Sequence, residues 1–499
     1  MQRQRFQGLR SRKPVMKTKN DTDAVHKNNH LKENSKTSKF LDSMNSRRTN
    51  ELVFIVTTFV SLSIYIPTLA PSIVGGDAGE LVAEGCKLGT SHPPGYPLFT
   101  VLVYIVTNMG RWFNNMINMN HFASSIFHSG LLLPKSPAYF VNFMSTCFGA
   151  MASGLISSSA YMLLSLKDDG NNSSVQDKSQ ELQQLQQNVK TDANGNLNRI
   201  ITVIAAVFVG IFHSLSPLSW YYSVTAEVFA LHNLFVAATI HTSIQFATNS
   251  SRTNLLFGSF LCGLSLTNQH TSILLQVPII LWVLSVTFKQ NKTVLPMLLL
   301  QASLYFLTGL SVYALLPYFS ITRPHAGSWG NVTTLSGLLD HMRRKDYGTF
   351  QLYSGDDTLS ESLIQRVYLW VYDFAWSQGW CSCVSFVCLL LGFKNAGSGK
   401  QSNGIIIVLN CSLVFYLLVF HSLSNLPLSN ALFFGIHQVN LFHSEYRTFK
   451  NFGVDLHVFF TFNEQYLLVF RDSGCIRISF VSYFLVLVLE TYSFGQYAM

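Results

Sequence analysis

The chain has 499 residues, of which 48% are hydrophobic and only 12% are charged. Several apolar runs approach twenty residues, the length needed to cross a bilayer, so the composition predicts an all-α polytopic membrane protein and excludes a soluble globular one. The net charge of +9 belongs to the first fifty residues, which hold thirteen Lys and Arg against four Asp and Glu.

Residues 1–50 form a basic tail with too few apolar residues to fold alone. Such a tail could bind nucleic acid. Because it directly precedes an apolar run, it more simply keeps the N-terminus in the cytoplasm and attracts anionic lipid. We expect no cleavable signal, since the run from Leu52 to Ala70 is too long and too far into the chain, and therefore stays as an anchor.

The stretch from Gly75 to Pro97 follows this anchor and carries Asp77, Glu80 and His92 near the expected membrane surface. Its residues Ala78 to Gly89 are predicted to form a short helix. A carboxylate in the lowered dielectric beside a membrane can have a raised pKa and act as a proton acceptor. The competing interpretation is structural: Asp77 caps the helix, Glu80 reaches back to it, and His92 only holds a turn.

The apolar runs predict nine membrane helices, at 52–70, 139–166, 200–217, 228–248, 254–267, 272–288, 294–318, 369–393 and 405–423. A segment too short to cross comfortably, Tyr96 to Met109, is expected to lie flat in the interface. With a cytoplasmic N-terminus, the non-cytoplasmic side receives 71–138 and 319–368, together with the short turns near 218–227 and 268–271. Every distinctive motif falls on that side.

Two of these short outer segments carry polar residues beside apolar helices. Glu227 stands at the mouth of an apolar helix, where it either faces a ligand or simply extends outward to water. Asn268 and His270 belong to a polar cluster, Thr267 to Thr271, which either faces a ligand or forms only the turn of a helical hairpin. The local sequence leaves both alternatives open.

The largest outer loop contains three adjacent cations, Arg343, Arg344 and Lys345, against the usual positive-inside bias. Because a guanidinium binds phosphate through two parallel hydrogen bonds, this exception suggests a negatively charged ligand. The alternatives are a solvated face or contact with lipid headgroups. In the same loop, Asn331 followed by Val and Thr fits an N-glycosylation acceptor.

Taken in order, these motifs resemble one family. They are Gly-Gly-Asp77-Ala-Gly-Glu80-Leu, His92-Pro-Pro-Gly-Tyr-Pro-Leu, Trp220 with Ala226-Glu227-Val228, Gly263 to Thr271, Trp329-Gly330, and Arg344-Lys-Asp-Tyr347-Gly-Thr-Phe. Through them, the chain from about Leu52 to about Gln438 resembles the transmembrane O-mannosyltransferases that modify plexin-type receptor domains. That family is similar to the GT-C glycosyltransferases, so the resemblance implies a GT-C-like bundle of transmembrane helices with luminal loops.

The resemblance further implies an enzyme of the endoplasmic reticulum membrane that uses dolichyl phosphate mannose. Its acceptors would be Ser or Thr of IPT domains in plexins and in the receptors for hepatocyte growth factor and macrophage-stimulating protein. Asp77 would be the catalytic base and Glu80 its neighbour. The candidate substrate-binding residues are His92, Glu227, Asn268, His270, Arg343, Arg344 and Tyr347. A single displacement at the anomeric carbon would invert the sugar linkage.

We expect neither a cofactor nor a metal. The most closely spaced cysteines, Cys381 and Cys383, lack the two-residue spacer of zinc and redox pairs. The departing lipid phosphate would instead be held by Arg343 or Arg344.

The expected organisation is a disordered tail at 1–50, a catalytic domain at 51–438 and a divergent segment at 439–499, which indicates a shortened or altered C-terminus. Its main luminal loops would be 71–138 and 319–368. Two other classes stay open: a polytopic transporter that couples ions through its carboxylates, and a catalytically inactive membrane partner. The chain has no internal repeat and its acids stand at loop edges, which argues against a transporter.

Overall fold

The computed structural model describes residues 45–119, 136–165, 181–290, 292–346, 362–378 and 401–423. These ranges are helices joined by turns and contain no strand, which confirms the predicted all-α class. The predicted basic tail up to residue 44, Tyr347, most of the predicted span at 369–393 and the divergent segment 439–499 lie outside them. The chain divides into a short unit, Met1–Leu52, and a large one, Val53–Met499, which holds all the candidate residues.

Within the described ranges, five helices are long and apolar enough to cross a membrane, in agreement with the polytopic class. They are Asn45–Thr68, α5 (Pro137–Ser165), the Leu197–Leu215 part of α6 (Glu181–Leu215), α10 (Ser272–Gln290), and Leu295–Thr322, which joins α11 (Leu295–Leu310), η2 (Ser311–Ala314) and α12 (Leu315–Thr322). Helices also occupy three further predicted spans: α8 (Phe229–Asn249), α9 (Arg252–Leu266) and α16 (Gln401–Leu423). The eighth predicted span begins within α14 (Leu363–Gln378).

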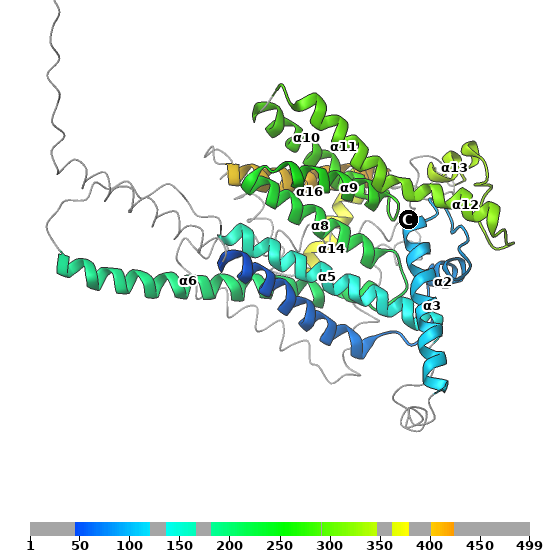
Figure 1. Ribbon diagram of the computed structural model, residues 1–499, viewed down its shortest axis with the longest axis horizontal. Helices are drawn as coiled ribbons and strands as arrows, with labels where there is room; N and C mark the ends of the chain where they lie inside the picture. The colour runs from blue at the N-terminus through cyan, green and yellow to red at the C-terminus, as the bar shows by residue number, and fades with distance from the viewer. Residues whose placement is uncertain are drawn as a thin grey trace, which may run out of the picture. The chain divides into compact units, whose positions relative to one another are not determined.

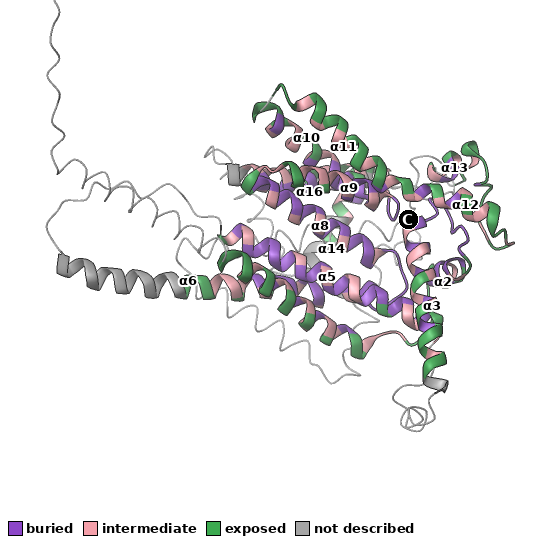
Figure 2. Ribbon diagram, in the orientation of Figure 1, coloured by how far each residue is buried: buried purple, intermediate pink, exposed green. Residues whose placement is uncertain are grey.

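The long helices of the large unit run side by side, and α5 and α8 are its most buried members (Figures 1 and 2). Both are apolar around most of their circumference, as expected of helices enclosed by other helices. Glycines allow α9 and α11 to approach each other closely. A Cβ at Gly263 would collide with the backbone of Phe306, and one at Gly309 with the backbone of Phe260.

At one end of this bundle lie α2 (Ala78–Lys87), α3 (Pro97–Met119), α12 and α13 (Leu335–Met342) (Figure 1). The predicted interfacial segment belongs to α3, which is longer than expected and runs across the direction of the long helices. Its exposed side chains include Met109 and Trp112. Segments far apart in sequence therefore meet around α2.

The position of α2 is set by its apolar face. Leu81 and Val82 pack with Phe99 and Val103 of α3 and with Val141 of α5 in one buried cluster. Burying such side chains stabilises the docked helix by roughly 1.5–3 kcal/mol each. The polar face of α2, which carries Glu80, is thereby turned toward His92 and the segment between α12 and α13.

Candidate functional site

The site begins where α2 begins. Asp77 occupies the N-cap position, with φ −81° and ψ −4°, but its side chain forms no capping hydrogen bond. The backbone N–H groups of Asp77 and Ala78 instead donate to the carboxylate of Glu227. Gly76, at φ 74°, leaves room for this carboxylate, since a Cβ there would lie 2.9 Å from Glu227 Oε1. The predicted helix start is correct, but the proposed capping contacts of Asp77 and Glu80 are wrong.

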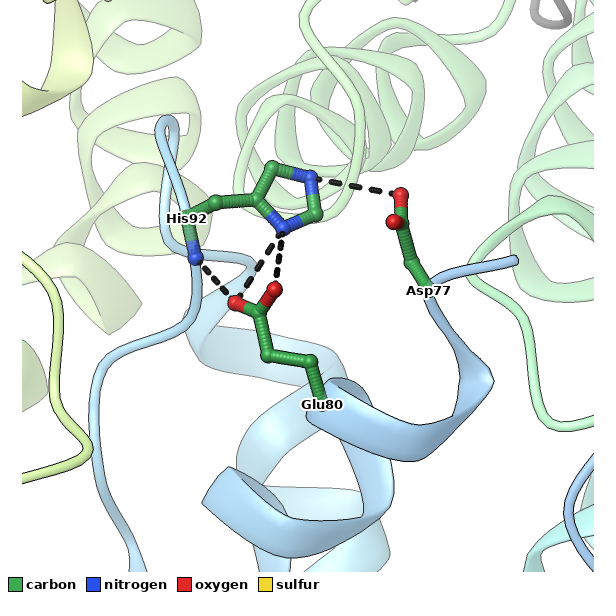
Figure 3. A group of neighbouring side chains, drawn as sticks. All are labelled: Asp77, Glu80 and His92. Carbon is green, nitrogen blue, oxygen red and sulfur yellow. Dashed lines mark hydrogen bonds and ion pairs between the residues drawn. The ribbon is translucent and has the colours of Figure 1, made fainter. Parts of the chain in front are cut away.

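His92 links the carboxylates of Asp77 and Glu80 (Figure 3). Its Nδ1 lies 3.2 Å from both carboxylate oxygens of Glu80, and its backbone N–H donates to Glu80 Oε1 at 2.6 Å. Its Nε2 lies 3.5 Å from Asp77 Oδ2. The side chain of Asp77 is 57% exposed, whereas that of His92 is only 11% exposed. The carboxylate of Asp77 thus contacts a buried imidazole on one side, and its exposed part is accessible to an incoming molecule.

A tight turn after His92 fixes the imidazole. The Gly95 N–H donates to the His92 carbonyl at 2.8 Å, and Gly95 has φ 92°, a conformation that favours glycine. The buried hydroxyl of Tyr96 lies 3.2 Å from His92 Nε2. Tyr96 was not among the predicted site residues. The signal in the sequence that could have indicated it is its position four residues after His92, in the same motif.

The ionisation state of Glu80 determines which nitrogen of His92 carries a hydrogen. Partial burial tends to raise the pKa of Glu80, but its hydrogen bonds to the ring and backbone of His92 and the imidazole charge outweigh this, so the pKa lies below its usual value. An ionised Glu80 can only accept, so His92 Nδ1 carries a hydrogen and donates to it. His92 Nε2 then either accepts from the Tyr96 hydroxyl or, when protonated, donates to Asp77.

Asp77, Glu80 and His92 each offer one ligand atom within 4.8 Å of the others, so among the described residues they are also the candidate group for holding a metal ion. Two carboxylates and an imidazole would suit a divalent transition metal. The hydrogen bonds of His92 to Glu80 already account for how closely these atoms lie.

Glu227 shares this corner with Asp77. Burial, reinforced by the negative charge of Asp77, raises the pKa of Glu227 to about 8, although the N–H donors of Ala78 and Asp77 lower it. Of the two alternatives left by the sequence, extension into water is wrong, because Glu227 is only 5% exposed. It contacts the backbone that carries Asp77 and so orients that residue.

The raised pKa of Glu227 leads to a prediction about stability. Between pH 4.5 and about 8, Glu227 is protonated in the folded chain but ionised in the unfolded chain. The protonated Glu227 therefore stabilises the fold fully below pH 4.5, and this stabilisation is lost as the pH rises through 8. We expect Glu227→Gln to match the parent chain near pH 5 and to melt higher near pH 8.5, by on the order of 2 °C or more. Thermal unfolding in detergent across this pH range measures the difference.

The matched control is Asp340→Asn, because Asp340 is a half-exposed carboxylate paired with Lys345 at 3.0 Å. Because this ion pair is largely exposed to solvent, Asp340→Asn should change the melting temperature little. If the Glu227→Gln chain melts lower than the parent at pH 8.5, the raised pKa of the buried Glu227 carboxylate is contradicted.

The 267–271 turn lies next to Glu227. Asn268 is fully buried and donates from Nδ2 to the carbonyl of Val228 at 3.1 Å, so it fastens this turn to the start of α8. This contact agrees with the alternative in which Asn268 stabilises the turn between two helices. His270 Nε2 lies 2.6 Å from the hydroxyl of Tyr313, and burial, reinforced by the charge of Arg344, lowers the pKa of His270 to about 4. His270 is a neutral imidazole.

The two candidate arginines occupy different environments. Arg343 ends α13 and is exposed, whereas Arg344 is half-buried and has φ 55°. The charge of Arg344 acts on both Tyr96 and His270: it opposes the rise that burial causes in the pKa of Tyr96 and adds to the fall in that of His270. Arg344 is therefore the cation that belongs to the site.

The remaining predicted residue in this loop, Asn331, is exposed, and its side-chain oxygen accepts from the Thr333 hydroxyl at 2.6 Å. Around Asp77, the structure thus gathers Glu80, His92, Tyr96 and Glu227, with Arg344 on the side of Tyr96. The result is an accessible carboxylate beside a buried imidazole, with a cation nearby, an arrangement that can remove a proton from a hydroxyl and stabilise an anion.

Comparison with known proteins identifies relatives of this chain. Residues 77–134 and 127–294 match the family described as Protein O-mannosyl-transferase TMEM260 N-terminal domain, so the matched region starts at Asp77. The chain is 30% identical over 388 residues to Protein O-mannosyl-transferase TMEM260 of Mus musculus, covering 76% of this chain and 46% of the relative. It is 29% identical over 400 residues to Protein O-mannosyl-transferase tmem260 of Dictyostelium discoideum, covering 77% and 42%. The chain spans less than half the length of these relatives. On this evidence, the chain belongs to the TMEM260 family.

Proposed function

We propose that this chain is a protein O-mannosyltransferase of the endoplasmic reticulum membrane, with a GT-C-like helix bundle. It transfers mannose from dolichyl phosphate mannose to Ser or Thr hydroxyls of IPT domains in plexins and in the receptors for hepatocyte growth factor and macrophage-stimulating protein. The names of its relatives support O-mannosyl transfer. The observation that carries the proposal is the accessible Asp77 carboxylate, supported from behind by His92 and Glu80.

In the proposed reaction, Asp77 accepts the proton of the acceptor hydroxyl while the oxygen attacks the anomeric carbon of mannose. The bond between that carbon and the phosphate oxygen breaks, and dolichyl phosphate leaves with the electron pair. His92 Nε2, 3.5 Å from Asp77 Oδ2, can then receive the proton. Glu80 keeps the ring in place at Nδ1 throughout. One displacement inverts the linkage, and no step needs a metal or a cofactor.

Arg344 is the proposed partner of the departing phosphate. A guanidinium offers two parallel hydrogen bonds to phosphate oxygens, and its charge counts for more in a partly buried site than in water. The neutral His270 and the Tyr96 hydroxyl share its surroundings. The charges of Asp77 and Arg344 both act on Tyr96, so the base and the anion partner belong to the same site, as a displacement requires.

The test is transfer of mannose to a folded IPT domain by microsomes that contain this chain as their only source of the activity. We expect radiolabel from dolichyl phosphate mannose on Ser or Thr of the domain, and an undiminished rate in the presence of EDTA. Loss of transfer with EDTA and recovery with Mn²⁺ would assign Asp77, Glu80 and His92 to a metal instead. Absence of transfer by a correctly folded chain would favour an inactive membrane partner.

The proposed topology places the site in the lumen, with a cytoplasmic N-terminus, and predicts glycosylation at one place. Asn331 is exposed and hydrogen-bonded to Thr333, as an acceptor segment can be. We expect Asn331 to be occupied in microsomes, and the acceptor sequences at Asn172 and Asn291 to be empty, because they face the cytoplasm in this topology. A gel shift lost on endoglycosidase treatment and in Asn331→Gln measures this. Glycosylation at Asn291 would show that the topology is the opposite of the proposed one.

A further inference from the structure

A second group of polar side chains lies on α2, one turn beyond Glu80. Glu84 is a buried carboxylate, with its side chain only 6% exposed. Its Oε2 lies 3.0 Å from His325 Nε2 and 3.1 Å from the hydroxyl of Ser328, both from the segment between α12 and α13. A buried carboxylate without partners would cost several kcal/mol, so these contacts are needed wherever Glu84 is buried.

The hydrogens of this group can be assigned from its neighbours. The Gly327 N–H donates to His325 Nδ1 at 3.1 Å, so Nδ1 bears the lone pair and Nε2 carries the hydrogen, which it donates to Glu84. The Ser328 hydroxyl accepts the Thr90 N–H at 3.0 Å and donates its own hydrogen to Glu84. Each donor in the group has an acceptor.

This assignment excludes a nucleophilic triad. In such a triad the serine donates to one imidazole nitrogen and the acid accepts from the other. Here Ser328 and Glu84 both face Nε2 of His325, and the hydroxyl hydrogen points to the carboxylate. The contacts suit the joining of two chain segments rather than an attack on a substrate.

The contacts continue from this group to the candidate site. The Trp329 N–H donates to the Thr90 carbonyl at 2.9 Å, and the Trp329 ring meets that of His92 edge-on, with centroids 6.4 Å apart. His341 Nε2 lies 3.1 Å from the Ser91 carbonyl. A Cβ at Gly89 would collide with Glu84, His325 and Ser328, so the two segments touch without a gap.

We propose that Glu84, His325 and Ser328 form a clasp that docks segment 323–346 onto the first loop and thereby positions Trp329 and Arg344 beside His92. The three are positioning residues for mannosyl transfer, and this role rests on the proposed function. The geometry of the clasp itself does not. Without the clasp, Trp329 loses its fixed contact with His92, and the segment that carries Arg344 is free to move away from Tyr96.

Amide hydrogen exchange of the purified full chain tests the docking without any measurement of activity. In Glu84→Ala, we expect the amides of Thr90 and Trp329 to exchange at least about fivefold faster, while those of α5 and α8 keep their parent rates. Ser328→Ala removes one hydroxyl only and should give the same pattern if Glu84→Ala folds poorly. Asp340→Asn, which breaks an ion pair within one segment, should change neither amide.

Two exchange results would overturn the clasp. One is an unchanged rate at Trp329 in both variants. The other is faster exchange throughout α5 and α8, which would make Glu84 a residue of general stability.

The transfer assay tests the positioning role. We expect kcat to fall about 10- to 100-fold in Glu84→Ala and Ser328→Ala, as for other small displacements of catalytic groups. Glu84→Gln keeps a carbonyl acceptor and should retain most of the rate. Faster exchange with an unchanged kcat would overturn the positioning role. If the parent chain transfers no mannose, the proposed function fails while the exchange pattern still tests the clasp.

Discussion

Replacing Asp77 by Asn is expected to lower the rate of mannose transfer by about 10²- to 10⁴-fold, the usual contribution of a positioned general base. Asn keeps the size of the side chain and can still face His92, but it cannot accept a proton at neutral pH. The backbone of Asp77 is held by Glu227 and not by its own side chain, so the helix start should survive the change. Initial rates with dolichyl phosphate mannose and a folded IPT domain measure the loss.

The control for this experiment is again Asp340→Asn, a carboxylate-to-amide change at an ion pair away from Asp77. It should transfer mannose at the parent rate. Asp77→Asn should also keep the melting temperature and the exchange rates of α2, so that the loss is catalytic and not structural. Transfer within tenfold of the parent rate would remove Asp77 as the base.

The fold was predictable because membrane helices leave a strong local signal. Continuous apolar runs near twenty residues have few other stable solutions in water or lipid. The described helices α5, α8, α9 and α10 begin and end close to the predicted limits, whereas α6 begins well before residue 200. The segment at Tyr96–Met109 was less well predicted. Its apolar pattern breaks near Arg111, yet α3 continues to Met119, because its last described turns are largely exposed and readily accommodate polar residues.

The sequence motifs indicated several of the residues that the structure brings together around Asp77, but not the contacts between them. Asp77, Glu80 and His92 are near neighbours in sequence, and their motif pointed to them directly. Glu227 lies 150 positions after Asp77, and its capping of a helix in another segment leaves no local pattern. The predicted capping box failed for the same reason, because a tertiary contact to the backbone released the side chains of Asp77 and Glu80.

The same limit applies to the outer loop. Glu84 lies one turn after Glu80 on α2, but nothing local in the sequence indicates that His325 and Ser328 reach it from more than 200 positions away. The adjacent arginines directly after the end of α13 also differ in environment, since Arg343 is exposed and Arg344 is half-buried. Sequence identifies the pair, and only the backbone conformation separates Arg343 from Arg344.

The different environments of Arg343 and Arg344 lead to the second prediction of a large effect on the rate. Arg344→Gln is expected to lower kcat by about 10²- to 10³-fold, the typical loss when one stabiliser of developing charge is removed. Arg343→Gln should stay within about threefold of the parent, because its exposed side chain interacts mainly with solvent. The two variants differ by one position and share the same chemical change, so each controls for the other. Steady-state rates with varied dolichyl phosphate mannose measure both.

Arg344→Lys distinguishes charge from geometry at the same position. Lysine keeps the positive charge but supplies a point charge in place of a planar fork, so an intermediate rate is expected if Arg344 binds a phosphate. Because the phosphate gains charge as the bond breaks, the loss in Arg344→Gln should fall on kcat more than on the KM for the donor. An equal or greater loss in Arg343→Gln would show that the exposed arginine holds the leaving group, and that segment 323–346 closes differently when the donor binds.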